Sequence, residues 1–385
     1  MKRVYFDNAA TTVIHPKVFD KMLPFLKENF GNPSSIHYHG RNARVAVESA
    51  REIIADFINA DPGEIYFCSN GTEANNFPVL GIARANKNET GKTGIIISEG
   101  EHLCILEPAN VLIKEGYSIK RIPLNRNGGN NLEYFPNSIS ENTSLVSIIH
   151  INNETGAEND IHKIASLTKE ENTYFHTDAV QSFGKIKIDV KKLGVDSLSA
   201  TGHKIYGPKG IGFAYIKSGT PVNPLIVGGS QERNRRGGTE NVAAIVGLAE
   251  AVKIAELEME NNSGIVQTLR TRLISGIKNL DNQGILINNE VTGFPYVLSI
   301  TLKNNFYKND AESILMYLDI NGISASNGAA CSSGTLKISH VISAMGLSDE
   351  DAKGTIRFSF SPENTFEEVD YCLEIISNML RNFKK

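Results

Sequence analysis

Lys204 is the residue with the clearest capacity for covalent chemistry. It lies in segment 199–210, which reads Ser-Ala-Thr-Gly-His-Lys-Ile-Tyr-Gly-Pro-Lys-Gly. An isolated lysine in such a turn is most often an exposed surface residue, and the GxxxxGK[ST] order of a P-loop is absent. The alternative is a lysine that forms a Schiff base with an aldehyde cofactor, because its amine becomes nucleophilic once its pKa is lowered. Thr201 and His203 beside it offer donors for an anion.

A carboxylate follows a predicted strand upstream of this lysine. Residues 174–176 (Tyr-Phe-His) read as a strand, so Asp178 lies at its carboxyl end, and open α/β sheets bind ligands at that edge. A single Asp in this position is more often a helix N-cap. It can also hold a pyridine ring nitrogen protonated, which turns the ring into an electron sink.

Two further positions favour a phosphorylated ring cofactor. The predicted strand 65–68 runs into a glycine turn that opens a helix, where Gly71 and Thr72 can cradle a phosphate. His102 follows another predicted strand and can stack on a ring. Each signal is weak alone, because a helix cap or an ordinary loop histidine looks the same. Cradle, histidine, aspartate and lysine in this chain order describe a pyridoxal-phosphate site.

Motifs along nearly the whole chain carry a resemblance to a known family. The sequence resembles the class V cysteine desulfurases, within the fold-type-I pyridoxal-phosphate enzymes, and in particular the nitrogen-fixation and iron–sulfur-assembly (NifS/IscS) type. The matching motifs are Tyr5-Phe6-Asp7-Asn8-Ala9-Ala10-Thr11-Thr12, Gly31-Asn32-Pro33-Ser34-Ser35, Gly71-Thr72-Glu73, Glu101-His102, Asn152-Asn153-Glu154, Asp178-Ala179-Val180-Gln181-Ser182, Gly202-His203-Lys204, Arg236-Gly237-Gly238-Thr239, Gly328-Ala329-Ala330-Cys331 and Ile356-Arg357-Phe358-Ser359.

The resemblance implies a cofactor role for each matching residue. Lys204 would hold pyridoxal 5'-phosphate covalently, Asp178 would pair with the ring nitrogen, Gln181 would bond the ring hydroxyl oxygen, and His102 would stack on the ring and move protons. The phosphate would be bound by Gly71, Thr72, Thr201 and His203, joined by Thr239 from the partner subunit of a homodimer. Asn153 would also contact the cofactor. No metal is implied.

The resemblance also implies the substrate site and the sulfur acceptor. Asn153 and Arg357 would grip the carboxylate of L-cysteine, a task for which the planar fork of arginine is suited. Cys331 would accept the sulfur. Its segment, 324–335, is made almost wholly of small and polar residues, and a sulfur acceptor needs a mobile loop of this kind. The alternative is a flexible surface turn whose cysteine has no function.

The other three cysteines have simpler interpretations. Cys68 lies within a predicted strand and Cys372 on the apolar face of the last predicted helix, so we expect both in the core. Cys104 replaces a small alanine expected from the family, and we interpret it as a packed, inert thiol. The four cysteines are far apart and show no metal-ligand spacing, which predicts neither a disulfide nor a zinc site.

The implied activity is conversion of L-cysteine to L-alanine, with the sulfur left on the enzyme as a persulfide. A sulfur-acceptor protein, such as an iron–sulfur scaffold or a protein of tRNA thiolation or thio-cofactor synthesis, would receive it. The chain ends shortly after the last predicted helix, without the tail that housekeeping members use to dock the scaffold, so the acceptor stays open. Alternatives on the same fold are a selenocysteine lyase or a class V aminotransferase. A further alternative is a catalytically inactive protein of this fold that only binds partners.

The elements that must position these residues alternate between strand and helix over roughly the first two-thirds of the chain. Short apolar strands, such as 145–149, alternate with amphipathic helices such as 43–58, which favours a mostly parallel sheet with helices on both faces. We expect a large α/β domain of fold type I over residues 13–258. A smaller α+β domain, residues 259–385 with segment 1–12, would carry the cysteine loop. A long helix should end near Glu260.

Composition limits the environment and the partners. Lys and Arg number 39 against 43 Asp and Glu, a net charge of −4, so no global positive field attracts nucleic acid or anionic lipid. The apolar stretch at the start of the chain is too short for a signal peptide, and no later run of apolar residues approaches the length of a membrane span. These features predict a cytoplasmic protein without nucleic-acid or membrane partners.

Overall fold

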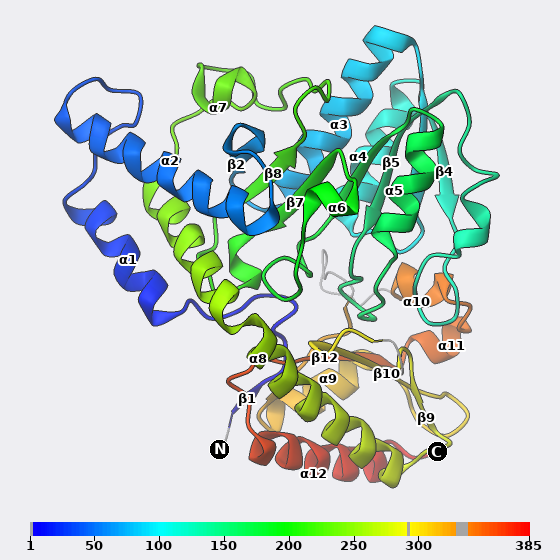
Figure 1. Ribbon diagram of the computed structural model, residues 1–385. Coiled ribbons are helices and arrows are strands. Elements are labelled where there is room, and N and C mark those ends of the chain that lie inside the picture. The colour runs from blue at the N-terminus through cyan, green and yellow to red at the C-terminus, as the bar shows by residue number, and fades with distance from the viewer. Residues whose placement is uncertain (1–2, 291–292, 329–337) are drawn as a thin grey trace.

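A seven-stranded sheet forms the centre of the larger of two bodies (Figure 1). The computed structural model describes residues 3–290, 293–328 and 338–385. In spatial order the strands of this sheet are β2 (Ile65–Cys68), β8 (Gly212–Ile216), β7 (Ser197–Thr201), β6 (Tyr174–Asp178), β5 (Thr143–Ile149), β3 (Gly94–Ser98) and β4 (Ser118–Ile122). β8 runs antiparallel to both of its neighbours, and the other adjacent pairs are parallel. The expected mixed, mostly parallel sheet is confirmed.

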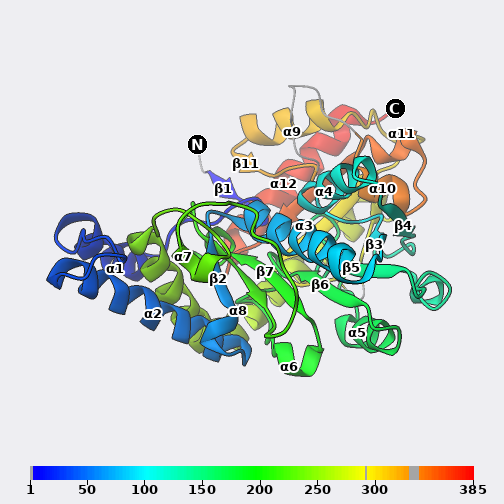
Figure 2. The same ribbon diagram turned by 90° about the horizontal axis from the view of Figure 1, so that it is seen from above.

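Helices cover both faces of this sheet, which is why its strands are apolar on both sides. One face carries α3 (Gly71–Thr90) and α4 (Leu103–Lys114), and Ile95 and Ile97 of β3 pack in that layer. Ile96 points to the opposite core, which α2 and α8 share (Figure 2). The elements on or near this second face are α1 (Pro16–Lys27), α2 (Tyr38–Ile58), α5 (Ile161–Glu170), α6 (Val190–Leu193) and α8 (Val242–Leu280).

Two strands of the large sheet were not predicted from the sequence. β7 reads Ser-Leu-Ser-Ala-Thr and β4 reads Ser-Ile-Lys-Arg-Ile. β7 is fully buried between helix layers, so small side chains fit there and the branched apolar residues typical of a strand are absent. β4 lies at the sheet edge, where charged residues face solvent and prevent further pairing.

The smaller body is built on an antiparallel sheet in the order β12-β10-β9. Its strands are β9 (Ile285–Ile287), β10 (Val297–Leu302) and β12 (Thr355–Ser359), and β1 (Val4–Tyr5) pairs in parallel with β11 (Ile323–Ser324) beside them. Its helices are α9 (Ala311–Ile320), α10 (His340–Ala344), α11 (Asp349–Ala352) and α12 (Phe366–Phe383). Short single turns complete the chain: η1 (Pro62–Glu64), η2 (Leu132–Tyr134), η3 (Gly202–Lys204) and α7 (Gln231–Asn234).

The expected end of the long helix near Glu260 is wrong, because α8 continues to Leu280 and joins the two bodies (Figure 1). The polar stretch 260–264 is an exposed to half-buried part of the helix rather than a linker. Leu248 packs in the large core, whereas Leu269 and Leu273 pack in the second core together with Phe6. The boundary placed at residue 258 therefore falls inside a helix, and the domain division stays a prediction.

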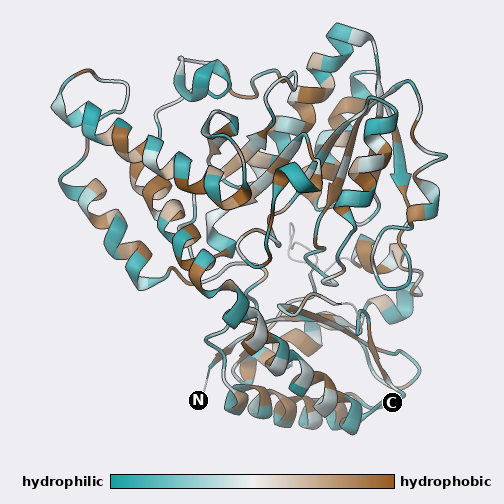
Figure 3. Cartoon of the chain, in the orientation of Figure 1, coloured by the Kyte–Doolittle hydropathy of each residue, from teal (hydrophilic) through white to brown (hydrophobic). Residues whose placement is uncertain are grey.

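Apolar residues gather inside both bodies and polar residues outside (Figure 3). Cys68 and Cys372 are buried, as expected. Among the described residues, no helix is long and apolar enough to cross a membrane. The loops at the carboxyl ends of the central strands face the smaller body (Figure 1).

Candidate active site

A cavity of about 370 Å³ lies at the carboxyl ends of β6 and β7 and at the N-termini of α3 and α4. Nearly all of the predicted site residues line it: Gly71, Thr72, His102, Asn153, Asp178, Gln181, Thr201, His203, Lys204 and Arg357. These residues are spread over most of the chain, so the fold alone brings them together. Cys331 lies outside the described residues. Thr239 is exposed and does not line this cavity.

Lys204 ends the short turn η3, directly after β7. Its Nζ donates to the carbonyl oxygens of Ala9, in a short bond, and Ala10, at 2.7 Å. Burial, with Arg357 nearby, lowers the pKa of Lys204 to about 8. Roughly a tenth of this amine is therefore unprotonated at pH 7, far more than for an ordinary lysine, and this is the form that attacks an aldehyde.

Asp178 is the last residue of β6 and is only 3% exposed. Its Oδ1 accepts from the backbone N–H of Val180 at 2.9 Å, and its Oδ2 accepts from Nδ2 of Asn75 at 2.8 Å. Burial raises the pKa of this carboxyl, and these donors oppose the shift. The carboxylate is thus held in one orientation at the cavity wall.

Two features of the cavity fit a phosphorylated pyridine. Gln181 donates through Nε2 to Ala9, at 2.9 Å, while its buried Oε1 has no hydrogen-bond partner among the described residues and can accept from a ring hydroxyl. At the start of α3, a Cβ on Gly71 would lie 3.1 Å from Val180 and 3.5 Å from Thr201. The first N–H groups of a helix have no partners within it, so this narrow turn is suited to an anion.

The two histidines of the cavity are held neutral. Nδ1 of His102 accepts from the backbone N–H of Cys104 at 3.1 Å, so the neutral ring carries its proton on Nε2. Burial lowers the pKa of His102, and it lowers that of His203 to about 4. His203 Nδ1 lies 3.2 Å from Oγ1 of Thr11. Both rings can therefore offer an N–H donor at neutral pH without adding a full charge.

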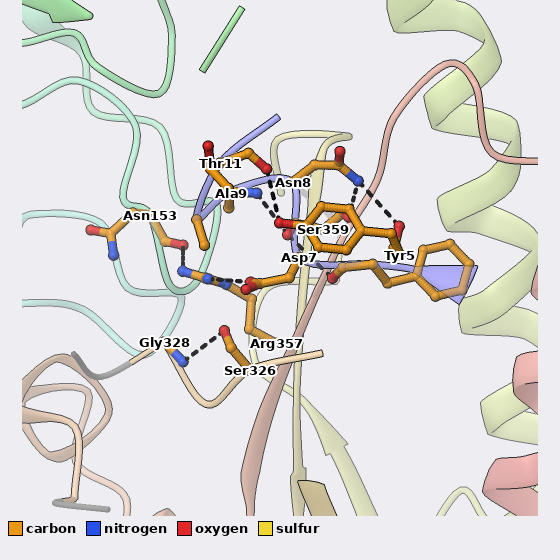
Figure 4. A network of polar contacts seen from close by, with 12 residues as sticks. Tyr5, Asp7, Asn8, Ala9, Thr11, Asn153, Ser326, Gly328, Arg357 and Ser359 are labelled. Atoms are coloured by element: carbon orange, nitrogen blue, oxygen red, sulfur yellow. Dashed lines mark hydrogen bonds and ion pairs between the residues drawn. The ribbon is translucent and has the colours of Figure 1, made fainter. Parts of the chain in front are cut away.

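Arg357 of β12 reaches the cavity from the smaller body and is 4% exposed (Figure 4). One terminal nitrogen bonds Oδ1 of Asp7 at 2.8 Å, and the other donates to the carbonyl oxygen of Asn153 at 2.9 Å. Its buried Nε has no partner among the described residues. The guanidinium is thus fixed in place and keeps a donor for a further acceptor, such as a carboxylate.

Sequence reasoning assigned no role to several polar residues of this cavity, among them Asp7, Asn75 and Cys104. Asp7 belongs to a recognised motif, but its ion pair with Arg357 depends on the pairing of distant segments, which no local pattern reveals. Cys104 stood out only as an unusual thiol. Asn75 gave no signal, since one polar residue on a helix resembles any other.

The segment that carries Thr239 is tied to the start of α3. Arg236 forms an ion pair with Glu73, with 2.7 Å between Nε and Oε1, and Glu73 also accepts from the backbone N–H of Ser69 at 2.7 Å. Although burial raises the pKa of Glu73, the donors from Arg236 and Ser69 outweigh it, so the pKa falls below its usual value. The ion pair therefore holds the segment that carries Thr239 against the phosphate cradle at the start of α3.

Comparison with known proteins extends these observations. The family model for class-V aminotransferases matches residues 4–372. A relative named cysteine desulfurase IscS, from Dictyoglomus turgidum, is 43% identical over 100% of this chain and 96% of its own. A solved NifS-like protein superposes with a TM-score of 0.91 at 38% identity, covering 99% of this chain and 100% of its own. A solved structure titled SspA in complex with cysteine gives 0.81 at 33% identity, covering 94% and 99%. The fold class expected from the sequence is confirmed.

Proposed function

The chain belongs to the class-V aminotransferase family, and we propose that it is a pyridoxal-phosphate-dependent cysteine desulfurase. It converts L-cysteine to L-alanine and keeps the sulfur as a persulfide on one of its own cysteines. One observation carries this proposal: three groups line one cavity, namely a lysine amine of lowered pKa, a buried aspartate, and an arginine whose Nε has no partner among the described residues. The curated relatives of similar length bear the same activity in their names.

The cavity residues suit the cofactor that the family uses. Lys204 would hold it, and Asp178 would keep its ring nitrogen protonated. Gln181 would bond the ring hydroxyl, His102 would lie against the ring, and the phosphate would be bound by Gly71, Thr72, Thr201 and His203. When bound, pyridoxal phosphate supplies a ring that withdraws electrons from the substrate Cα.

The remaining work falls to the side chains themselves. Arg357 and Asn153 bind the substrate carboxylate and so orient Cα toward the lysine. The Lys204 amine, once free, removes the Cα proton. His102 keeps its N–H on Nε2 at neutral pH and can donate a hydrogen bond from it within the cavity.

Sulfur transfer is assigned to Cys331, which lies outside the described residues. Its thiolate attacks the sulfur of the substrate, so that an S–S bond forms and the Cβ–S bond breaks. The electron pair of the broken bond stays with the carbon fragment, which takes up protons and leaves as alanine. One cysteine and one enzyme thiol thus give one alanine and one enzyme persulfide, with no other oxidant.

The persulfide sulfur then passes to an acceptor protein, and iron–sulfur cluster assembly is the proposed destination. The described cysteines are all free thiols, which fits a reducing cytoplasm.

An aminotransferase would need a keto acid as co-substrate. The test supplies L-cysteine and a thiol reductant without any keto acid, and measures alanine and sulfide separately. We expect both in equal amounts, whereas dependence on added keto acid would contradict the proposal.

The enzyme acts as a homodimer in which Thr239 contacts the phosphate bound by the partner subunit. Large, strongly exposed apolar side chains in the loop between α1 and α2 and at the start of α2 support this: Phe30 is 72% exposed, Ile36 90% and Tyr38 63%. Val227, in another loop, is 84% exposed. Such residues are costly to leave in water and are typical of a surface that another protein covers.

A further inference from the structure

Three donors converge on the carboxylate of Asp178. Besides the bond from Val180 to Oδ1, Oδ2 receives Nδ2 of Asn75 at 2.8 Å and lies 3.8 Å from Sγ of Cys104. An ionised carboxylate offers about four acceptor positions, so roughly one remains for a group in the cavity. The donor set therefore decides how strongly this carboxylate attracts a further proton.

The side-chain amide of Asn75 is oriented to donate to the carboxylate of Asp178. Asn75 is fully buried, and its Nδ2 also lies 3.1 Å from Sγ of Cys104. Its Oδ1 has no partner among the described residues. A flipped amide would place that oxygen against Asp178, so the side chain keeps its donor on the carboxylate and leaves a buried acceptor unsatisfied.

Cys104 is placed as a donor rather than as a nucleophile. It lies in the first turn of α4, is 7% exposed, and lines the cavity beside Asp178. Burial first, and the charge of Asp178 second, raise the pKa of the thiol well above its usual value. The sulfur therefore keeps its proton, which it can give to Oδ2 of Asp178 as a weak hydrogen bond.

We propose that Cys104, together with Asn75, is a positioning residue that keeps Asp178 weakly basic, so that the shared proton stays on the ring nitrogen of the bound cofactor. This rests on the proposed function. A proton between a carboxylate and a pyridine nitrogen moves toward the more basic partner. Each donor to the carboxylate stabilises its ionised form and lowers its proton affinity. Loss of the thiol would leave the ring less protonated and less able to withdraw electrons.

Two substitutions at position 104 separate this electrostatic role from packing. Cys104→Ala removes the donor, whereas Cys104→Ser keeps a donor in a similar volume. Cys68→Ala is the matched control, because Cys68 is likewise buried in the same apolar layer but donates to the carbonyl oxygen of Tyr66. Each purified holoenzyme is loaded with pyridoxal phosphate labelled with ¹⁵N in the ring, and the ring-nitrogen signal is recorded by NMR.

The ring-nitrogen signal of Cys104→Ala should move toward that of unprotonated pyridine. The signals of Cys104→Ser and Cys68→Ala should stay at the wild-type position. Exchange of the Cα proton of L-alanine in heavy water should slow roughly threefold to tenfold in Cys104→Ala alone, as expected for one weak bond to a charged group. A wild-type signal in Cys104→Ala, or equal shifts in the alanine and serine variants, would overturn the proposal. Failure of the wild-type protein to bind the labelled cofactor would instead refute the proposed function.

Discussion

At the scale of single residues, the chemistry depends on how burial and neighbouring charges alter a few titratable groups. The amine of Lys204 and the carboxyl of Asp178 are both shifted toward their neutral forms by burial. For the lysine this shift is useful, since only the neutral amine is nucleophilic. For the aspartate it is harmful, and the donors from Val180 and Asn75 offset only part of it.

The lowered pKa of Lys204 predicts a specific pH dependence of its reactivity in the cofactor-free protein. Below about 8 the amine is mostly protonated, so acylation by an amine-selective reagent should rise steeply with pH and level off above about 8. In the urea-unfolded chain the same peptide should continue to gain reactivity up to the ordinary lysine pKa of about 10.4. Peptide mass spectrometry gives both curves. Coincident curves would show that the fold does not alter this amine.

Asp178→Asn keeps the shape of the side chain but removes its charge. Because the charge is needed most when electrons move into the ring, we expect kcat for alanine formation to fall by roughly 100-fold to 1000-fold, with little loss of bound cofactor. Steady-state kinetics and the absorbance of the bound cofactor measure the two effects. Alanine formation within about twofold of wild type would remove this role from Asp178.

At the scale of elements, strand ends and helix starts are what assemble the site. β6 and β7 end at Asp178 and Thr201, α3 and α4 begin beside Gly71 and His102, and β12 brings Arg357 from the smaller body. The N-terminal segment completes the site, because Asp7 pairs with Arg357 (Figure 4).

Arg357→Lys tests whether the fork of this arginine matters. A lysine keeps the charge but cannot contact Asp7, the Asn153 carbonyl and a substrate carboxylate at once. We therefore expect KM for L-cysteine to rise by about tenfold or more, with a smaller change in kcat. Arg272→Lys is the control, since Arg272 pairs with Asp370 on the surface, at 2.7 Å. An unchanged KM in Arg357→Lys would exclude substrate binding by this residue.

The elements also mark how far the sequence could be interpreted. Strongly apolar strands such as β5 and β10 were predictable, because both of their faces are buried. β7 was not, since its small residues resemble a loop although tertiary packing makes it a strand. Likewise α8 passes through a polar stretch that suggested a boundary, because packing on two cores sustains the helix.

The candidate site was more predictable than the fold that builds it. Its cavity-lining residues were expected because their types and chain order match a family with one chemistry. The contacts that hold them were not, since the bond from Asn75 to Asp178 joins residues 103 positions apart in the chain. The pair of Arg357 with Asp7 joins residues 350 positions apart.

At the scale of the whole molecule, we predict a homodimer whose interface includes the exposed loop before α2. Ile36→Asp should yield monomers that retain less cofactor, because the partner's contribution to the phosphate site is lost. Light scattering gives the mass, and absorbance gives the cofactor content. Met316→Asp, at an exposed apolar residue of α9 in the smaller body, is the control and should stay dimeric. A wild-type monomer with full cofactor content would contradict the prediction.

The most direct test of the central claim follows the sulfur itself. The holoenzyme is given a pulse of L-cysteine without reductant, digested, and analysed by mass spectrometry, alongside Cys331→Ser. We predict one added sulfur atom on the peptide of Cys331, none on those of Cys68, Cys104 and Cys372, and almost no alanine from the serine variant. Undiminished alanine formation by Cys331→Ser, or sulfur carried on the Cys104 peptide instead, would contradict the account.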